Sequence, residues 1–330
     1  RRLLRTAAVL ALAGLAGSLA FTWVHRPAPK APKADLGARP ARRSVSVLGF
    51  RNLSRRQETA WLSTALSEMF RSELAVGDQL HTITGESVTR ARRDLELAEV
   101  DSLSPETLAR LRRLLGCDVI LLGSYLILNG DEGHQIRVDL RLQDTENGEM
   151  LTALTGTRTE KDLFNLVSEL GQDLRLRLGS RRTEGKEAVS TRAAFPVSRL
   201  AARRYAEGLQ RQRSLDTLAA VELLRQATQA EPEFPLAHAA LASAWATLGY
   251  DRNARDEAAK ALELATHLSR EERLLVEALH FETRSNWVKA AEIYESLWRF
   301  FPDDPEYGLR LARAKVKAGR AQDARGFRRS

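Results

Sequence analysis

Hydrophobic positions between residues 44 and 180 alternate between a spacing of two and a spacing of three to four residues. A spacing of two, or a short continuous apolar run, predicts a β-strand, and the wider spacing predicts an amphipathic helix. The run over 119–127 is apolar almost throughout, which indicates a central strand buried on both faces. We therefore expect strands over 44–50, 80–84, 119–127, 135–143 and 149–157, and helices over 57–76, 87–97, 105–115 and 161–178. This order of elements predicts a mixed sheet covered by helices.

The sequence over residues 198–330 contains an internal repeat with an offset of 70 residues. Ala220 and Pro232, for example, align with Ala290 and Pro302. Seventy residues correspond to about two units of the 34-residue tetratricopeptide period. We expect about four such helical units, the last of them truncated, stacked into an α-solenoid. They begin near Ala201, Pro235, Glu271 and Pro305.

The N-terminal stretch over residues 6–24 contains no charged residue. Nineteen residues of helix span about 28 Å, close to the hydrocarbon thickness of a bilayer. Three arginines precede the stretch and Trp23 lies near its end, as is typical of a membrane span. We therefore expect a single transmembrane helix. The alternative is a signal peptide with a cleavage site at Ser18-Leu19-Ala20.

These patterns together predict an α/β plus all-α fold class: a transmembrane helix, a mixed-sheet α/β domain and a tetratricopeptide solenoid. The expected order is an anchor over 1–24, a Pro-rich basic linker over 25–43, the α/β domain over 44–180, a linker over 181–197 and the repeats over 198–330.

The net charge lies almost wholly at the N-terminus. Residues 1–43 hold nine of the 51 basic residues and one of the 43 acids, so this segment accounts for the whole formal charge of +8. A neutral remainder disfavours a basic nucleic-acid-binding domain. The arginines before residue 6 predict a single-pass protein of the inner (cytoplasmic) membrane with residues 44–330 extracytoplasmic. The linker is basic as well, so the orientation stays open, and small residues in the span would allow a homodimer.

Three motifs of the α/β domain resemble one family. The segment 47–54 (VLGFRNLS), the strand 116–124 (GCDVILLGS) and the hairpin 142–149 are similar in order and spacing to the TolB-like amino-terminal (FlgO-like) domain. The stretch 268–312 resembles the repeats that follow such domains in bacterial membrane-anchored serine/threonine protein kinases. The resemblance implies a TolB-N-like α/β fold without known catalytic residues.

This resemblance implies a non-catalytic sensor or protein-interaction region of a bacterial signalling protein, whose kinase domain would lie before Arg1. One alternative is an exported envelope scaffold or assembly protein. Another is the periplasmic part of a winged-helix transcription regulator or nucleotide cyclase. An enzyme within 44–180 would instead require a polar pocket with clustered titratable groups.

Motifs of catalysis and of cofactor binding are absent from the sequence: it contains no GxGxxG after a strand, no P-loop, no HExxH and no kinase signature. Cys117 opens a buried strand and is expected to be structural. Glu277 and His280 have a spacing that some metal sites use, but no second pair accompanies them. We therefore expect no catalytic residue, cofactor or metal in this segment.

Stacked helical repeats present a concave face, lined by the first helix of each unit, that binds peptides or partner helices. The expected ligand is a protein or peptide in this groove. The positions predicted to contact it are Tyr205, Arg213, Ala239, Ser243, Leu275 and Glu282.

Overall fold

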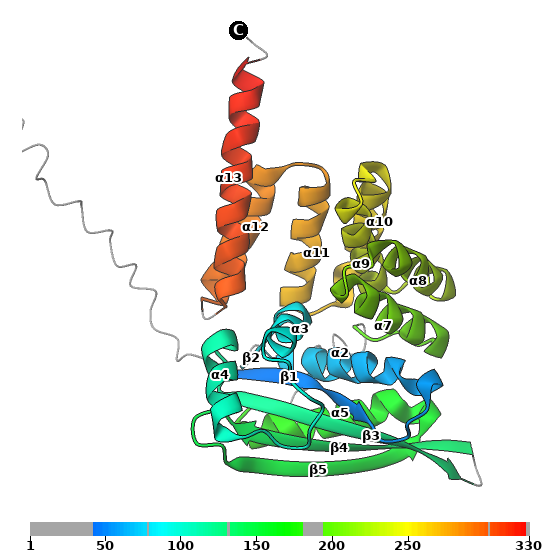
Figure 1. Cartoon of the computed structure of the whole chain (residues 1–330). Helices are drawn as coiled ribbons and strands as arrows, with labels where there is room; N and C mark the ends of the chain where they lie inside the picture. Colours follow the sequence, from blue (N-terminus) through cyan, green and yellow to red (C-terminus); the bar gives the residue numbers. More distant parts are fainter. Residues whose placement is uncertain (1–41, 78, 131–132, 181–193, 303, 328–330) are drawn as a thin grey trace, which may run out of the picture. The chain divides into compact units, whose positions relative to one another are not determined.

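The computed structural model describes residues 42–77, 79–130, 133–180, 194–302 and 304–327 (Figure 1). From Arg42 onward the chain is one compact unit. Its strands form one five-stranded mixed sheet in the order β2-β1-β3-β4-β5. β1 is parallel to β2 and β3, whereas β3, β4 and β5 form an antiparallel meander. The strands are β1 (Arg43–Asn52), β2 (Leu80–Thr82), β3 (Val119–Gly130), β4 (Gly133–Asp144) and β5 (Met150–Thr159).

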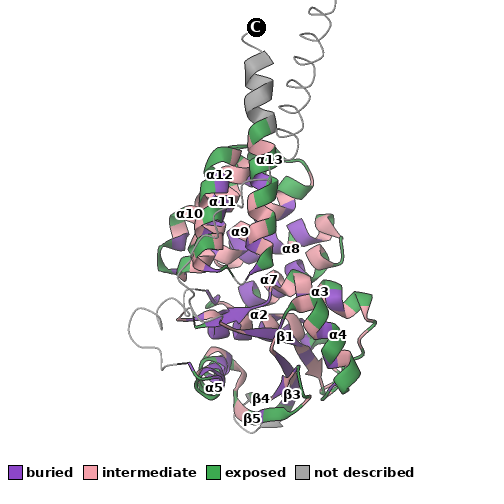
Figure 2. Cartoon of the chain, turned by 90° about the vertical axis from the view of Figure 1, so that its left-hand side faces the viewer, coloured by how far each residue is buried: buried purple, intermediate pink, exposed green. Residues whose placement is uncertain are grey.

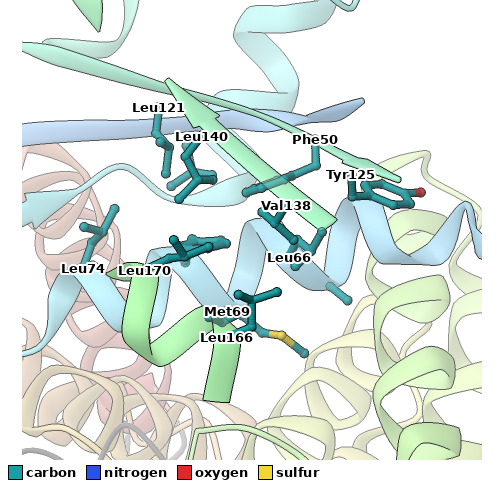
Figure 3. Close-up of a cluster of buried hydrophobic side chains, with 14 of the residues drawn as sticks. Phe50, Leu66, Met69, Leu74, Leu121, Tyr125, Val138, Leu140, Leu166 and Leu170 are labelled. Carbon is teal, nitrogen blue, oxygen red and sulfur yellow. The ribbon is translucent and has the colours of Figure 1, made fainter. Parts of the chain in front are cut away.

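Two helices cover one face of this sheet. Apolar side chains of α2 (Trp61–Ala75) and α5 (Leu163–Arg177) meet those of the strands in the main core. Figure 3 shows Leu66 and Met69 of α2, together with Leu166 and Leu170 of α5, among strand residues such as Tyr125. The hydroxyl of Tyr125, buried in this core, donates to the carbonyl oxygen of Thr59 at 2.8 Å.

On the opposite face, helices of the described chain cover β1 and β3, and the backbone of Leu103 bonds the side chain of Gln143 on β4. α3 (Gly85–Asp94) and α4 (Pro105–Leu115) bury a second cluster against Leu48, Ile120 and Leu122. α4 begins where the hydroxyl of Ser104 accepts from the Thr107 amide at 3.3 Å. It ends at Gly116, whose φ of 65° is left-handed.

The second half of the described chain is helical, and Figure 2 shows buried residues along these helices as well as on the sheet. α7 packs against α8 so closely that a Cβ on Gly208 would lie 2.7 Å from Cγ of Leu224. The helices are α7 (Arg199–Arg213), α8 (Thr217–Ala230), α9 (Pro235–Thr247), α10 (Asp251–Leu264), α11 (Arg270–Thr283), α12 (Trp287–Phe300) and α13 (Pro305–Phe327).

This half is not a separate all-α body. Phe195, Ala202 and Ala206 belong to the same hydrophobic core as the sheet, α2 and α5. The predicted class, α/β plus all-α with a tetratricopeptide α-solenoid, is therefore wrong, and the described chain is a mixed α/β fold with one five-stranded sheet. The predicted domain boundaries stay predictions, and most of the expected linker 181–197 lies outside the described residues.

The membrane predictions also need correction. The helix expected over 6–24 lies outside the described residues, as does most of the basic linker. Between Arg42 and Phe327, in the ranges given above, no helix has the length and apolar composition needed to cross a membrane. The longest of them, α13, carries arginine and lysine along its length. The predicted fold class and the predicted single-pass localisation are corrected to this extent: the described structure contains no membrane-spanning helix.

A buried ion pair joins the two helices on the main core. Arg175 of α5 donates to the Glu73 carboxylate of α2 at 2.7 Å and also to the Glu73 carbonyl oxygen. The two side chains are only 3% and 2% exposed. Gly171, one turn earlier on α5, leaves room for Glu73, because a Cβ there would lie 2.1 Å from its Cγ.

The close crossing of α7 and α8 generates a test with a matched control. Replacing Gly208 with alanine forces the buried Leu224 to move, so we expect Gly208→Ala to lower the free energy of unfolding by about 1–3 kcal/mol. In Gly319→Ala the added Cβ meets nothing within 4 Å, so the higher helix propensity of alanine should raise stability by about 0.5–1 kcal/mol. Urea unfolding measures both, and equal effects of the two variants would contradict the described packing.

Candidate functional site

One turn of α2 carries three polar side chains, Glu68, Arg71 and Ser72, on the side away from the sheet; we refer to it as the polar turn of α2. Arg213, at the end of α7, donates to Oε1 of Glu68 at 2.6 Å. Arg71 donates to the other oxygen, Oε2, at 3.0 Å. Glu68 and Arg213 are both 12% exposed at their side chains. A nearly buried carboxylate is thus shared by two arginines.

The start of α3 extends this network. Arg213 also reaches Oε1 of Glu86 at 3.3 Å. Gly85 leaves room for the guanidinium, because a Cβ there would lie 2.2 Å from its Nη2 and would force Arg213 to shift. One arginine of α7 therefore binds two acids that come from two helices of the sheet half.

The pKa of Glu68 reflects these neighbours. Burial alone would raise it, but the charges of Arg213 and Arg71 and their hydrogen bonds outweigh burial and lower the pKa to about 2. The carboxylate consequently stays ionised in the folded chain at neutral and mildly acid pH.

Ser72 connects the same turn of α2 to a second helix of the helical half. Its hydroxyl donates to Oε1 of Glu272 at 3.2 Å. Oε2 of Glu272 meanwhile accepts from Ser269 in a capping box that begins α11. Three neighbouring residues of α2 thus hold both α7 and α11.

Two of the six predicted groove residues lie at this contact. Arg213 makes the ion pairs just described. Tyr205 lies beside Glu68 and Arg71 in a small apolar pocket, and its ring meets that of Phe234 edge-on at 4.9 Å. Burial raises the pKa of its hydroxyl. Both residues face other parts of the same chain.

The other four lie on α9 and α11. Ala239 packs in a cluster with Leu262, and Leu275 in one with Tyr294. Ser243 accepts from Gln212 at 3.4 Å, and Glu282 accepts from the Tyr294 hydroxyl at 3.1 Å. Within the described residues no hydrogen bond or ion pair joins any two of the six. Their role as a shared ligand groove stays a prediction.

Sequence patterns did not single out the partners of Arg213. Glu68 and Arg71 are spaced three apart on a predicted helix, which is typical of a solvated surface pair. Glu68 lies 145 residues before Arg213. Nothing local in the sequence could connect them.

A cleft of ≈ 230 Å³ opens between α4 and the start of α13; we call it the α4–α13 cleft. Leu114 of α4 and Leu309 of α13 both line it, and they are 54% and 66% exposed. Its other lining residues include Ser87, Leu115, Pro305 and Glu306. Two large apolar side chains thus share one open cleft.

Arginines flank these leucines on both helices. Arg110 lies one turn before Leu114 and Arg113 directly precedes it, whereas Arg313 lies one turn after Leu309. None of the three forms an ion pair within the described part of the chain. Two acids of the described residues line the cleft: Glu306 accepts from Arg310 at 3.0 Å, and the buried carboxylate of Asp304 lies 3.9 Å from His81. The three arginines lie outside this lining, next to the exposed leucines on the two helices.

A larger hollow of ≈ 670 Å³ lies beside Trp61, Phe164 and Ala202. Within the described ranges, four titratable side chains line it beside the apolar ones: His134, Lys161, and Arg199 and Glu160, which pair with each other at 2.5 Å.

Residues considered for chemistry from the sequence lie in unreactive surroundings. Burial raises the pKa of the Cys117 thiol to about 12, so the thiol stays protonated. His280 accepts from Arg284 at 3.1 Å, and burial together with that charge lowers its pKa. Within the described residues, no three His, Cys, Asp or Glu side chains are grouped to hold a metal ion.

Comparison with known proteins gives distant structural matches only. No protein-family model matches the chain, and no curated protein matches it. The C-terminal domain of LpoB from Salmonella enterica matches at 18% identity and a TM-score of 0.28, over 38% of this chain and 90% of that one. Lipoprotein GNA1162 from Neisseria meningitidis matches at 17% identity and a TM-score of 0.30, over 41% of this chain and 99% of that one. PelC from Paraburkholderia phytofirmans, solved as a dodecamer, matches at 16% identity and a TM-score of 0.27, over 43% of this chain and 89% of that one.

These matches do not confirm the resemblance to TolB-like domains, and at such TM-scores they assign no function. The expected description as a protein with a transmembrane helix is contradicted, because no helix of the described residues could cross a membrane. The expected serine/threonine kinase has no supporting observation.

The shared carboxylate yields a stability prediction. Arg213→Met keeps the length of the side chain but leaves Glu68 with one partner, so we expect a loss of about 2–3 kcal/mol in the free energy of unfolding. The control is Arg211→Met on the same helix; Arg211 is 58% exposed and should change stability by less than about 0.5 kcal/mol. Chemical denaturation distinguishes them, and a similar small effect of both would mean that α7 is not held this way.

The pKa of Glu68 also predicts a pH dependence. A carboxyl whose folded pKa lies below the unfolded value near 4.5 stabilises above that value, and this stabilisation disappears as the pH falls towards 2. The wild type should therefore lose on the order of 2–3 kcal/mol more than Glu68→Gln between pH 5 and pH 2. Burial raises the pKa of Glu73, which gives the opposite slope, but Glu73 is present in both proteins and cancels in the difference. Parallel stability profiles of the two proteins would contradict the assignment.

Proposed function

We propose that this chain is a non-catalytic scaffold or assembly protein that binds an acidic amphipathic helix of a partner protein in the α4–α13 cleft. The observation that carries this proposal is the pair Leu114 and Leu309, both more than half exposed and both lining one cleft. Large apolar side chains gathered in one open place are typical of protein-binding surfaces.

Exposed arginines next to the two leucines favour a partner that carries carboxylates. Arg110, Arg113 and Arg313 flank the leucines and have no ionic partner among the described residues. A partner with carboxylates would gain these three charges, whereas a basic partner would be repelled.

The spacing of the surface favours a helix as the occupant. Val316, 54% exposed, follows Leu309 two turns later on α13, so the apolar side of that helix continues beyond the cleft. A partner helix with apolar side chains at positions i, i+4 and i+7 would match a stripe of this kind.

Among the functions expected from the sequence, this proposal corresponds to the envelope scaffold or assembly protein. The sensor region of a serine/threonine kinase, and the alternatives of a winged-helix regulator or a cyclase, have no supporting observation. Recognition through Tyr205, Arg213, Ala239, Ser243, Leu275 and Glu282 would be a second route to protein binding, but Arg213 already binds Glu68 and Glu86 of the same chain.

The cleft can be tested with a designed probe and the full chain. We expect a fluorescein-labelled helical peptide with leucines on one side and glutamates on the other to bind at least tenfold more tightly than its lysine counterpart, measured by anisotropy. The double variant Leu114→Asp, Leu309→Asp should weaken binding of the glutamate peptide at least tenfold. Leu218→Asp on α8, where the leucine is 71% exposed away from the cleft, should leave it unchanged.

A photo-crosslinking amino acid placed at position 309 would identify the natural partner in cells. The same amino acid at position 218, outside the cleft, serves as the control. Crosslinks at 309 that map to acidic helical segments of another protein support the proposal. Crosslinks to a second copy of this chain, or equal binding of both peptides in the first experiment, would exclude it.

A further inference from the structure

The meander ends in an uncovered edge strand. β5 has β4 as its only neighbour in the sheet, and Figure 1 shows it as the outermost strand. The opposite edge, β2, is three residues long, whereas β5 has ten. The outer backbone groups of β5 therefore have no strand partner within the described residues, and such an edge is a template for another strand.

Most of the usual devices that protect an edge are missing from β5. Between Met150 and Thr159 there is no proline, no lysine and no acid. The one charged residue, Arg158, is tied to Glu169 of α5 at 2.8 Å. The register of β4 and β5 shifts only between Leu142 and Gln143, so residues 152–159 pair with β4 without interruption. This leaves eight regular residues, of which four are threonine, a good strand former.

The sheet face beside β5 is open as well. α3 and α4 cover the strands β1 and β3, so that face of β4 carries polar residues such as Asp139 and Arg141. Ala153 and Thr155 of β5 are exposed on this side, opposite Arg141 and Asp139 of β4. A strand approaching the edge would meet no helix of the described chain there.

We propose that β5 pairs antiparallel with β5 of a second copy of this chain, about a two-fold axis at Thr155. An antiparallel pair of identical strands makes every contact twice, which is the interface of a two-fold dimer. In this register Ala153 lies opposite Thr157 of the second copy, and Thr152 lies opposite Arg158. No like charges face each other, and threonine–threonine pairing at the axis is favourable.

The occupant follows from the strand itself. An edge strand that carried charge would select a partner of opposite charge. The side chains on the open side of β5, Ala153, Thr155 and Thr157, are uncharged and small. Its own sequence is thus a suitable complement and is present at equal concentration. The pairing would join two five-stranded sheets into one continuous sheet, and it is independent of the α4–α13 cleft.

Like charges placed at the predicted pair of positions 153 and 157 test the proposal. In the variant Ala153→Asp, Thr157→Asp, each new carboxylate meets another across the axis, so we expect the dimer dissociation constant from sedimentation to rise at least tenfold. Within one chain these carboxylates lie beside Arg141 and Arg137, so folding is preserved. The control Gln135→Asp adds a charge to the same face of the sheet, but on β4. It should leave the dimer dissociation constant unchanged.

A complementary variant, Ala153→Lys, Thr157→Lys, should also be monomeric alone, but an equimolar mixture with the aspartate variant should restore the dimer. Hydrogen exchange should show slower exchange of alternate β5 amides as the wild-type concentration rises. A wild type that stays monomeric at 100 µM overturns the proposal. So does a dimer that the aspartate variant leaves intact, or a mixture that fails to restore pairing.

Discussion

The carboxylate of Glu68, held between Arg71 and Arg213, joins the helical half of the chain to its sheet. A carboxylate this far from solvent is costly unless it is paired, so docking of α7 on α2 without its terminal arginine would lose stability. α2 has two different sides: its apolar residues form the core against the strands, and its polar turn holds α7 and α11. Because a charged contact is directional, it fixes where the helical half lies, which apolar packing alone would leave adjustable.

Most elements of the sheet half could be predicted from the sequence because their signals are local. The strand over 119–127 is a nearly continuous apolar run, and β3 indeed lies between two strands. Ser104, Pro105 and Gly116 mark both ends of α4, and the helix has those bounds. The helix expected over 87–97 instead spans Gly85–Asp94, because Thr84 caps it with a bond to the Ser87 amide. The first boundary thus depended on a single hydroxyl, whereas the last lies three residues before the predicted one, with Leu95 as C-cap.

The relation between the two halves could not be predicted in this way. The 34-residue period indicates helices, but it contains no information on what covers their inner side. In the structure Arg213 meets acids from α2 and α3, so a position expected to bind a ligand binds its own chain. The α4–α13 cleft was hidden for a similar reason: Leu114 and Leu309 occur at helical spacing, as core residues do, and only the fold shows that they stay exposed.

The pair Glu73–Arg175, buried between α2 and α5, has a different consequence from the shared carboxylate of Glu68. Its contribution to net stability is small, since apolar residues of similar size would pack there at least as well. The pair instead favours one position of α5 on α2 over alternative positions. A slip of α5 by one turn would move the guanidinium by about 5.4 Å and place Gly171 away from Glu73, leaving two opposite charges unmatched in apolar surroundings. The native arrangement is thereby separated in energy from near-native ones that bury the same leucines, so that the sequence specifies one docking of α5 among several that its apolar side would allow.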